Sequence, residues 1–129
     1  MKTFHVVSHT HWDREWYQPF EVFRHRLVDL MDHLLEIFNG YPDFVFELDA
    51  QMVCLEDYLE IRPHRREEVE RRIRSGNLIV GPWYVQNDFF LTDGESTVRN
   101  LLIGTEIARR SGSCNFCGYM PDQFGIAGQ

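Results

Sequence analysis

Apolar segments of two different periodicities alternate along this chain, and their alternation limits the folds that it can adopt. Short runs rich in β-branched and aromatic residues predict four strands, at residues 3–8, 44–48, 78–80 and 117–120. Between them, apolar side chains recur every three or four positions, which predicts helices at residues 20–38, 52–59, 65–75 and 95–111. Strands that alternate with helices form a parallel sheet with covering helices, so the sequence predicts an α/β fold.

Local signals give the ends of these helices. Gly40 and Gly76 follow the first and third helices, where glycine commonly ends a helix, and Pro63 follows the second. Thr92 or Asp93 is suited to cap the last helix. For that helix we expect a buried apolar face made of Val98, Leu101, Leu102, Thr105 and Ala108.

Polar side chains follow every predicted strand. They lie at residues 9–13, 49–51, 86–88 and 122–123. Ligands bind at the carboxyl edge of parallel α/β sheets, and four polar loops at one edge therefore predict a binding site there. For any single loop the alternative is ordinary helix capping, and for Asp93 we prefer that alternative.

The first of these loops has the side chains of a metal site. His11 and Asp13 are two positions apart in an extended segment, so they point the same way and can grip one ion. Imidazole and carboxylate together suit a divalent ion such as zinc. The tryptophans of this loop offer flat apolar surfaces that a sugar ring can use. The alternative is a loop of exposed polar residues in which Trp16 anchors the core.

Composition excludes several classes of partner. The chain has 129 residues, 43% of them hydrophobic, which is enough for one domain with a real core. Its net charge of −7 argues against nucleic-acid binding, because phosphate contacts need a basic face. No apolar run approaches the length of a membrane span, so no membrane partner is expected.

Cysteine usage and the N-terminus bear on the compartment. Three cysteines, an odd number, suit a reducing cytoplasm better than a disulfide framework. The chain enters its first strand without a signal-peptide pattern. Cys114 and Cys117 form a Cys-x-x-Cys pair that has no second pair to complete a four-ligand zinc site, and we interpret the spacing as chance. We therefore expect a cytoplasmic protein.

Four motifs, in order, resemble those of one enzyme family. They are the segments Ser8–Trp16, Gly81–Asp88, Glu95–Leu101 and Gly118–Gly125. The chain is similar to the N-terminal part of the family-38 glycoside hydrolases, the zinc-dependent α-mannosidases. The form His-Trp-Asp-Arg-Glu-Trp at residues 11–16 resembles the bacterial branch, which includes 2-O-mannosylglycerate hydrolases. The resemblance implies that residues 1–129 are the first strands of an incomplete (β/α) barrel, a truncated part of the catalytic domain.

The resemblance also implies roles for individual residues. His11 and Asp13 would be ligands of one Zn²⁺ ion, and Asp88 would be both a ligand and the catalytic nucleophile. Trp16 would lie against the bound sugar, and Asp122 would contact substrate or orient groups nearby. The family's remaining zinc-binding histidine and its acid/base aspartate come after a segment of this size. We expect His9 to be a buried, neutral imidazole beside the site, and not a ligand.

The implied function is a retaining α-mannosidase that hydrolyses terminal α-mannosides through a covalent intermediate on Asp88. The substrate would be an α-mannoside or a mannosyl-containing small molecule, and 2-O-mannosylglycerate hydrolase is an alternative in the same family. Two other hypotheses stay open, a zinc deacetylase with a metal-bound water as nucleophile and a non-catalytic carbohydrate-binding fragment. The 129-residue piece alone is expected to be inactive. Homo-oligomerisation is left open.

Overall fold

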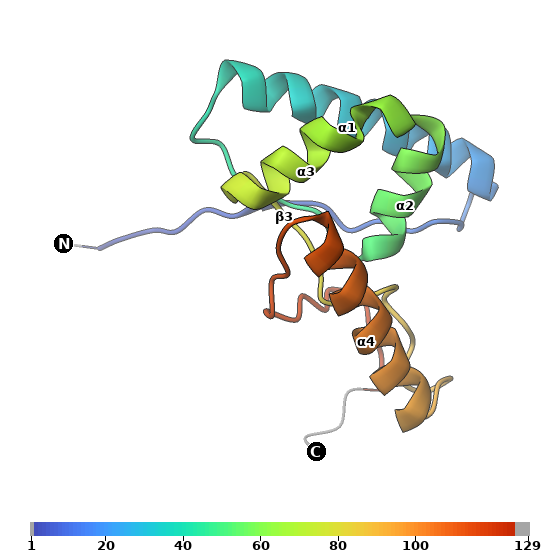
Figure 1. Cartoon of the computed structure of the whole chain (residues 1–129). Helices are drawn as coiled ribbons and strands as arrows, with labels where there is room; N and C mark the ends of the chain where they lie inside the picture. The colour runs from blue at the N-terminus through green and yellow to red at the C-terminus, as the bar shows by residue number, and fades with distance from the viewer. Residues whose placement is uncertain (1, 126–129) are drawn as a thin grey trace.

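A computed structural model describes residues 2–125 and has a three-stranded parallel sheet at its centre. The strands are β1 (Ser8–His9), β2 (Phe46–Glu47) and β3 (Leu78–Ile79), in the order β1-β2-β3. The register places Ser8 and Leu78 on either side of Phe46. Figure 1 shows α1 and α3 above the strands and α4 below them. The predicted α/β fold with a parallel sheet is therefore confirmed.

Three α-helices and one short 3₁₀ helix follow the first two strands. Helix α1 spans Phe20–Gly40, and its apolar stripe is buried against the core through Phe23, Leu27, Val28, Met31, Leu34, Leu35 and Phe38. Helix α2 (Met52–Ile61) is buried over most of its length and packs against α1. After the short 3₁₀ helix η1 (Pro63–Arg65), the charged helix α3 (Arg66–Ser75) contributes Val69 and Ile73 to the core. Gly76, at φ +82°, ends α3 in the left-handed region that favours glycine.

Helix α4 (Gly94–Ser111) begins at the expected cap, because the Asp93 side chain accepts a hydrogen bond from the Ser96 N–H at 2.7 Å. Its predicted buried face is wrong in part, since Val98 and Leu102 are exposed. The buried positions are Asn100, Gly104, Ala108 and Ser111.

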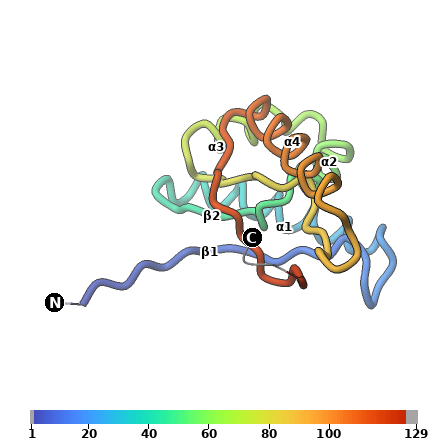
Figure 2. Tube along the Cα trace, turned by 90° about the horizontal axis from the view of Figure 1, so that it is seen from below, coloured from blue at the N-terminus to red at the C-terminus, as the bar shows by residue number. Residues whose placement is uncertain are grey.

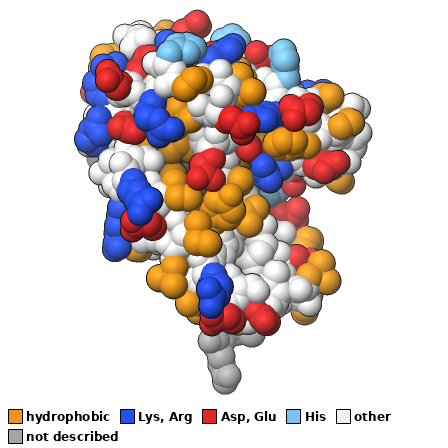
Figure 3. Space-filling model, turned by 45° about the vertical axis from the view of Figure 1, so that its right-hand side comes forward, with side chains coloured by type: hydrophobic (Ala, Val, Ile, Leu, Met, Phe, Trp, Pro, Cys, Tyr) orange, Lys and Arg blue, Asp and Glu red, His pale blue; other side chains and the backbone are white. Residues whose placement is uncertain are grey.

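The small side chains on α4 have a steric reason. A Cβ atom added at Gly104 would overlap the backbone of residues 82–84, which passes directly beneath the helix. Because larger side chains would hold the helix off that segment, they lie on its other faces. Figure 3 shows hydrophobic side chains at the molecular surface, between groups of charged residues.

Three predicted strands are shorter than expected and the fourth is absent. Phe4, Val6 and Val7 are exposed by 63–90%, and strand pairing begins only at Ser8. Figure 2 shows this N-terminal segment running out beyond the rest of the molecule, where it has no layer to pack against. Residues 117–120 form no strand, although the Asn115 N–H donates to the Val80 carbonyl at 2.9 Å just beyond β3. A strand needs a continuous partner, and these segments lack one among the described residues.

None of the helices within residues 2–125 is both long enough and apolar enough to cross a membrane.

Candidate metal centre at the carboxyl edge of the sheet

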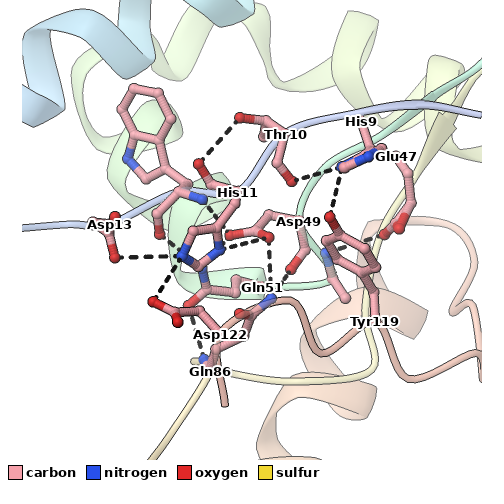
Figure 4. Close-up of polar contacts among 12 residues, drawn as sticks. His9, Thr10, His11, Asp13, Glu47, Asp49, Gln51, Gln86, Tyr119 and Asp122 are labelled. Carbon is pink, nitrogen blue, oxygen red and sulfur yellow. Dashed lines mark hydrogen bonds and ion pairs between the residues drawn. The ribbon is translucent and has the colours of Figure 1, made fainter. Parts of the chain in front are cut away.

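The loops that follow the three strands are joined by hydrogen bonds at one edge of the sheet. The Trp12 N–H, after β1, donates to Asp49 Oδ2 at 2.6 Å, after β2. Gln86, after β3, donates from Nε2 to the Asp49 carbonyl at 2.8 Å and to Asp49 Oδ1 at 3.0 Å. Gln51 Nε2 donates a hydrogen bond to the Trp12 carbonyl at 2.9 Å. The predicted convergence of these polar loops is therefore confirmed (Figure 4).

Asp49 is the centre of this network. Its side chain is fully buried, and the backbone at Asp49 and Ala50 is left-handed, with φ of 45° and 53°. Aspartate tolerates that conformation better than most residues, which allows the chain to turn sharply after β2. Burial raises the pKa of the Asp49 carboxyl above its ordinary value, although hydrogen bonds from Trp12 and Gln51 act in the opposite direction.

Three side chains present possible metal ligands beside Asp49. One donor atom each from His11, Asp13 and Asp122 lies within 4.8 Å of the other two. His11 Nε2 is 3.5 Å from Asp13 Oδ1 and 3.7 Å from Asp122 Oδ2. The fourth loop, which carries Asp122, thus reaches the same edge of the sheet as the other three (Figure 4).

The three donor atoms fit a zinc ion. Tetrahedral zinc with bonds of about 2.0–2.2 Å separates neighbouring ligand atoms by roughly 3.3–3.6 Å. The two separations from His11 Nε2 are close to that range, and one imidazole with two carboxylates is a common zinc donor set. The donors line an open pocket with Trp12, Gln51 and Gln86, so a ligand has access from solvent.

The predicted site residues fall into two groups in this structure. His11 and Asp13 come together as expected, and Asp122 joins them as a third donor, a role that the sequence did not suggest. Asp88 is outside this group, and its Oδ1 accepts a hydrogen bond from the Phe90 N–H at 2.9 Å. Its assignment as zinc ligand and nucleophile stays a prediction.

The two tryptophans of the first loop have different environments. Trp12 packs against the core and meets Phe23 edge-on, with ring centroids 6.3 Å apart. Trp16 is 75% exposed and contacts Tyr17 at a centroid distance of 5.2 Å. The alternative in which Trp16 anchors the core is therefore wrong, because Trp12 has that place. An exposed indole is free to contact a sugar, and that role for Trp16 stays a prediction.

His9 is not part of the metal-capable group, which is formed by His11, Asp13 and Asp122. The expectation of a buried imidazole is wrong, because the His9 side chain is exposed at the edge of the three-stranded sheet. His9 Nδ1 and the Tyr119 hydroxyl are hydrogen-bonded at 2.7 Å, and their rings meet edge-on. This contact ties the C-terminal loop to β1.

The sequence pointed to the loop after β2 without identifying what Asp49 does there. Asp49 is one of several polar residues at a strand end, and ordinary helix capping is the alternative interpretation of any such loop. Only the packing of three loops around it shows that its carboxylate is the common acceptor.

A parallel sheet whose carboxyl edge carries a cluster of possible metal ligands is the arrangement of α/β enzymes. The whole chain, residues 1–129, matches the Glycosyl hydrolases family 38 N-terminal domain, and the chain belongs to this family. The resemblance seen in the sequence motifs is therefore confirmed.

Two of the similar proteins are named for hydrolysis of mannosyl compounds. A Halalkalibacterium halodurans protein named "Putative mannosylglycerate hydrolase" is 52% identical over 130 residues, which cover 99% of this chain and 14% of that protein. An α-mannosidase from Enterococcus faecalis V583 superposes with a TM-score of 0.87 at 44% identity, over 91% of this chain and 13% of the enzyme. A second family-38 protein from Enterococcus faecalis has a TM-score of 0.81 at 41% identity, over 91% of this chain and 14% of that protein. This chain thus spans about one seventh of each relative.

Proposed function

We propose that this chain is part of a zinc-dependent retaining α-mannosidase. The observation that carries the proposal is the convergence of His11, Asp13 and Asp122 at the carboxyl edge of a sheet that superposes on an α-mannosidase. The substrate class is a terminal α-mannoside or a mannosyl-containing small molecule. The fold and the donor set both support this function. The choice of a mannosyl substrate is supported by the names of the similar proteins.

In this proposal His11 Nε2 and the carboxylates of Asp13 and Asp122 would hold the metal, and the Asp88 carboxylate would be a further ligand. When bound, Zn²⁺ would coordinate sugar hydroxyls and favour the distorted ring of the oxocarbenium-like transition state. Asp122, beside the same imidazole, would also orient or contact the substrate. Trp16 would offer its exposed indole face to the sugar ring.

The nucleophile in this proposal is the Asp88 carboxylate. It would attack the anomeric carbon, form a glycosyl ester and release the aglycone, which takes a proton from a general acid outside the described residues. Water would then hydrolyse the ester, so the sugar keeps its anomeric configuration. The loop position of Asp88 supports this role, because Gln86 of the same loop is anchored on Asp49 beside the metal-capable group.

One experiment separates this mechanism from a zinc deacetylase and from a non-catalytic module. The intact protein is incubated with an activated fluorinated α-mannosyl donor, and the trapped peptide is sequenced by mass spectrometry. We expect one mannosyl ester on Asp88 and about one zinc ion per chain by elemental analysis. Zinc without an adduct would favour the deacetylase chemistry, and absence of both would favour a binding module.

The relative named as a mannosylglycerate hydrolase favours a second candidate that differs only in the aglycone. Comparing kcat/KM for 2-O-mannosylglycerate and for an aryl α-mannoside distinguishes the two substrates. We also propose a cytoplasmic location, which is supported by three free cysteines, Cys54, Cys114 and Cys117.

A further inference from the structure

The His11 imidazole lies between two sets of oxygen atoms. Its Nε2 faces the open pocket, 3.5 Å from Asp13 Oδ1 and 3.7 Å from Asp122 Oδ2. Its Nδ1 faces the interior, 3.4 Å from Asp49 Oδ1 (Figure 4). The Asp49 side chain is fully buried, whereas that of His11 is 30% exposed. The ring therefore has an interior side and a pocket side.

The other neighbours of the Asp49 carboxylate donate hydrogen bonds. Oδ2 accepts from the Trp12 N–H at 2.6 Å and from Gln51 Nε2 at 2.5 Å. Oδ1 accepts from Gln86 Nε2 at 3.0 Å and also faces His11. The orientation of Gln51 is fixed independently, because its Oε1 accepts from the Gln86 N–H at 2.8 Å. An ionised carboxylate can only accept hydrogen bonds and has room for about four of them. His11 Nδ1, which also faces Oδ1, is therefore expected to be the fourth donor.

We propose that Asp49 is the positioning residue of the metal centre. It holds His11 as the tautomer that carries its proton on Nδ1 and leaves the Nε2 lone pair directed at a divalent cation. A carboxylate on the second nitrogen of a metal-binding histidine fixes both the tautomer and the ring orientation. This inference rests on the proposed function, because it concerns the same metal centre, and it adds a residue that would not touch the metal.

The surroundings of Asp49 favour a built support over an incidental contact. The carboxylate is held by donors from the loops after β1, β2 and β3, so its position depends on the whole sheet edge. The left-handed turn at Asp49 and Ala50 places it there. A side chain held so firmly can set the angle of a partly exposed imidazole.

The test is Asp49→Asn in the intact protein, compared with Glu47→Gln as a matched control. Asparagine tolerates the left-handed backbone and keeps the shape of the side chain, so the turn after β2 is preserved. The amide nitrogen of the new asparagine must take the place of either Oδ1 or Oδ2 of Asp49, and both of these oxygens now face only hydrogen-bond donors. If the amide nitrogen faces His11, Nδ1 must become an acceptor and Nε2 must carry the proton, which blocks the metal. Glu47 is also a buried carboxylate of this segment, but its Oε1 accepts from the Ala50 N–H at 3.1 Å.

The measurement is the zinc dissociation constant, obtained by competition with a chromophoric chelator, with no substrate present. We expect Asp49→Asn to weaken zinc binding by roughly 10–100-fold. Glu47→Gln should stay within about threefold of the unaltered protein, because it leaves the partner of His11 in place. In a His11→Ala background, Asp49→Asn should have almost no further effect, because Asp49 acts through that imidazole.

The outcomes separate this inference from the proposed function. Zinc affinity unchanged by Asp49→Asn, or an equal loss in the His11→Ala background, would overturn the role of Asp49 and leave the metal centre intact. No zinc binding by the unaltered protein would overturn the proposed function and this inference with it. If Asp49→Asn does not fold, the structure of the zinc-loaded unaltered protein decides. Nδ1 must then donate to Asp49 with Nε2 on zinc, and any other partner of Nδ1 overturns the inference.

Discussion

Arg14 grips the Asp57 carboxylate with two hydrogen bonds, from Nε at 2.7 Å and from Nη2 at 2.9 Å. The pair joins the loop that carries His11 and Asp13 to helix α2, which is part of the core. The Asp57 side chain is only 9% exposed, and the Arg14 guanidinium also lies 4.7 Å from the centre of the Phe20 ring. The hydrogen bond from Arg14 to Asp57 also raises the pKa of the guanidinium. The position of the loop that carries His11 and Asp13 therefore depends on the two hydrogen bonds between Arg14 and Asp57.

Arg14→Lys is expected to destabilise the domain by about 1.5–3 kcal/mol, because lysine cannot form both bonds and leaves a nearly buried carboxylate under-satisfied. The free energy of unfolding is measured by urea titration with tryptophan fluorescence. Arg99→Lys is the control, since Arg99 makes an exposed contact with Glu95 on α4 and should change the free energy by less than about 0.5 kcal/mol. Equal effects of the two substitutions would contradict the importance of the Arg14 contact.

Gly104→Ala should destabilise the protein, although alanine is the better helix former. The added Cβ would overlap backbone atoms of residues 82–84, which cannot move as a flexible side chain could. We expect a loss of at least about 1–3 kcal/mol, measured as a lowered urea midpoint. Gly94→Ala is the matched control on the same helix, because a Cβ there meets no atom within 4 Å, and its stability should be unchanged or slightly higher. A stable Gly104→Ala variant would show that α4 lies farther from this segment than described.

Asp88→Asn in the intact protein is expected to lower turnover of an activated α-mannoside by at least about a thousandfold at saturating zinc. The amide keeps the shape of the side chain but removes the nucleophile and weakens its hold on the metal. Asp93→Asn, five residues farther along, should stay within about threefold, because asparagine caps a helix as well as aspartate does. Near-normal turnover of Asp88→Asn would mean that Asp88 is structural and that another group attacks the sugar.

The stability of the protein should depend on pH through Asp32. This carboxylate accepts hydrogen bonds from Tyr58 at 2.7 Å and from Arg62 at 3.2 Å. Burial raises the pKa of this carboxyl, but the bonds from Tyr58 and Arg62 outweigh it and the net pKa is lowered. A lowered folded-state pKa gives stability above the ordinary pKa of 3.8 that is lost as pH falls through the folded value.

Asp32→Asn should therefore lower the melting temperature at pH 7 and have a smaller effect at a pH below 3.8, where the contribution of this carboxylate is lost as the pH falls toward its folded-state pKa. Thermal melts of both proteins at the two pH values make the comparison. Asp29→Asn, which alters an exposed carboxylate near His25 on α1, serves as the control and should show no comparable difference. A constant gap between Asp32→Asn and the unaltered protein would contradict the assignment.

Local sequence determined the helices, the end of α3 and the start of α4, whereas α1 continues through Gly40, which was expected to follow it. The apolar repeat of α1, the glycine after α3 and the Asp93 cap act within one or two helical turns, so they can be read without knowing the fold. The parallel order of the strands followed from their alternation with helices, and the meeting of polar loops at one edge followed from that order. The spacing of His11 and Asp13 similarly gave two of the three clustered metal donors.

Only the tertiary structure decided features that depend on a partner distant in the chain. Residues 4–7 have a strand-like sequence but no paired strand among the described residues, and α4 buries Gly104 because the backbone of residues 82–84 passes beneath it. Trp12 and Trp16 are equally apolar in the sequence, and the position of Phe23 makes Trp12 the one that packs inward. Asp49 became the common acceptor because donors separated by 37 residues on either side meet at its carboxylate. Which of several similar side chains becomes buried or hydrogen-bonded depends on contacts between segments that are distant in the chain, and local sequence does not contain those contacts.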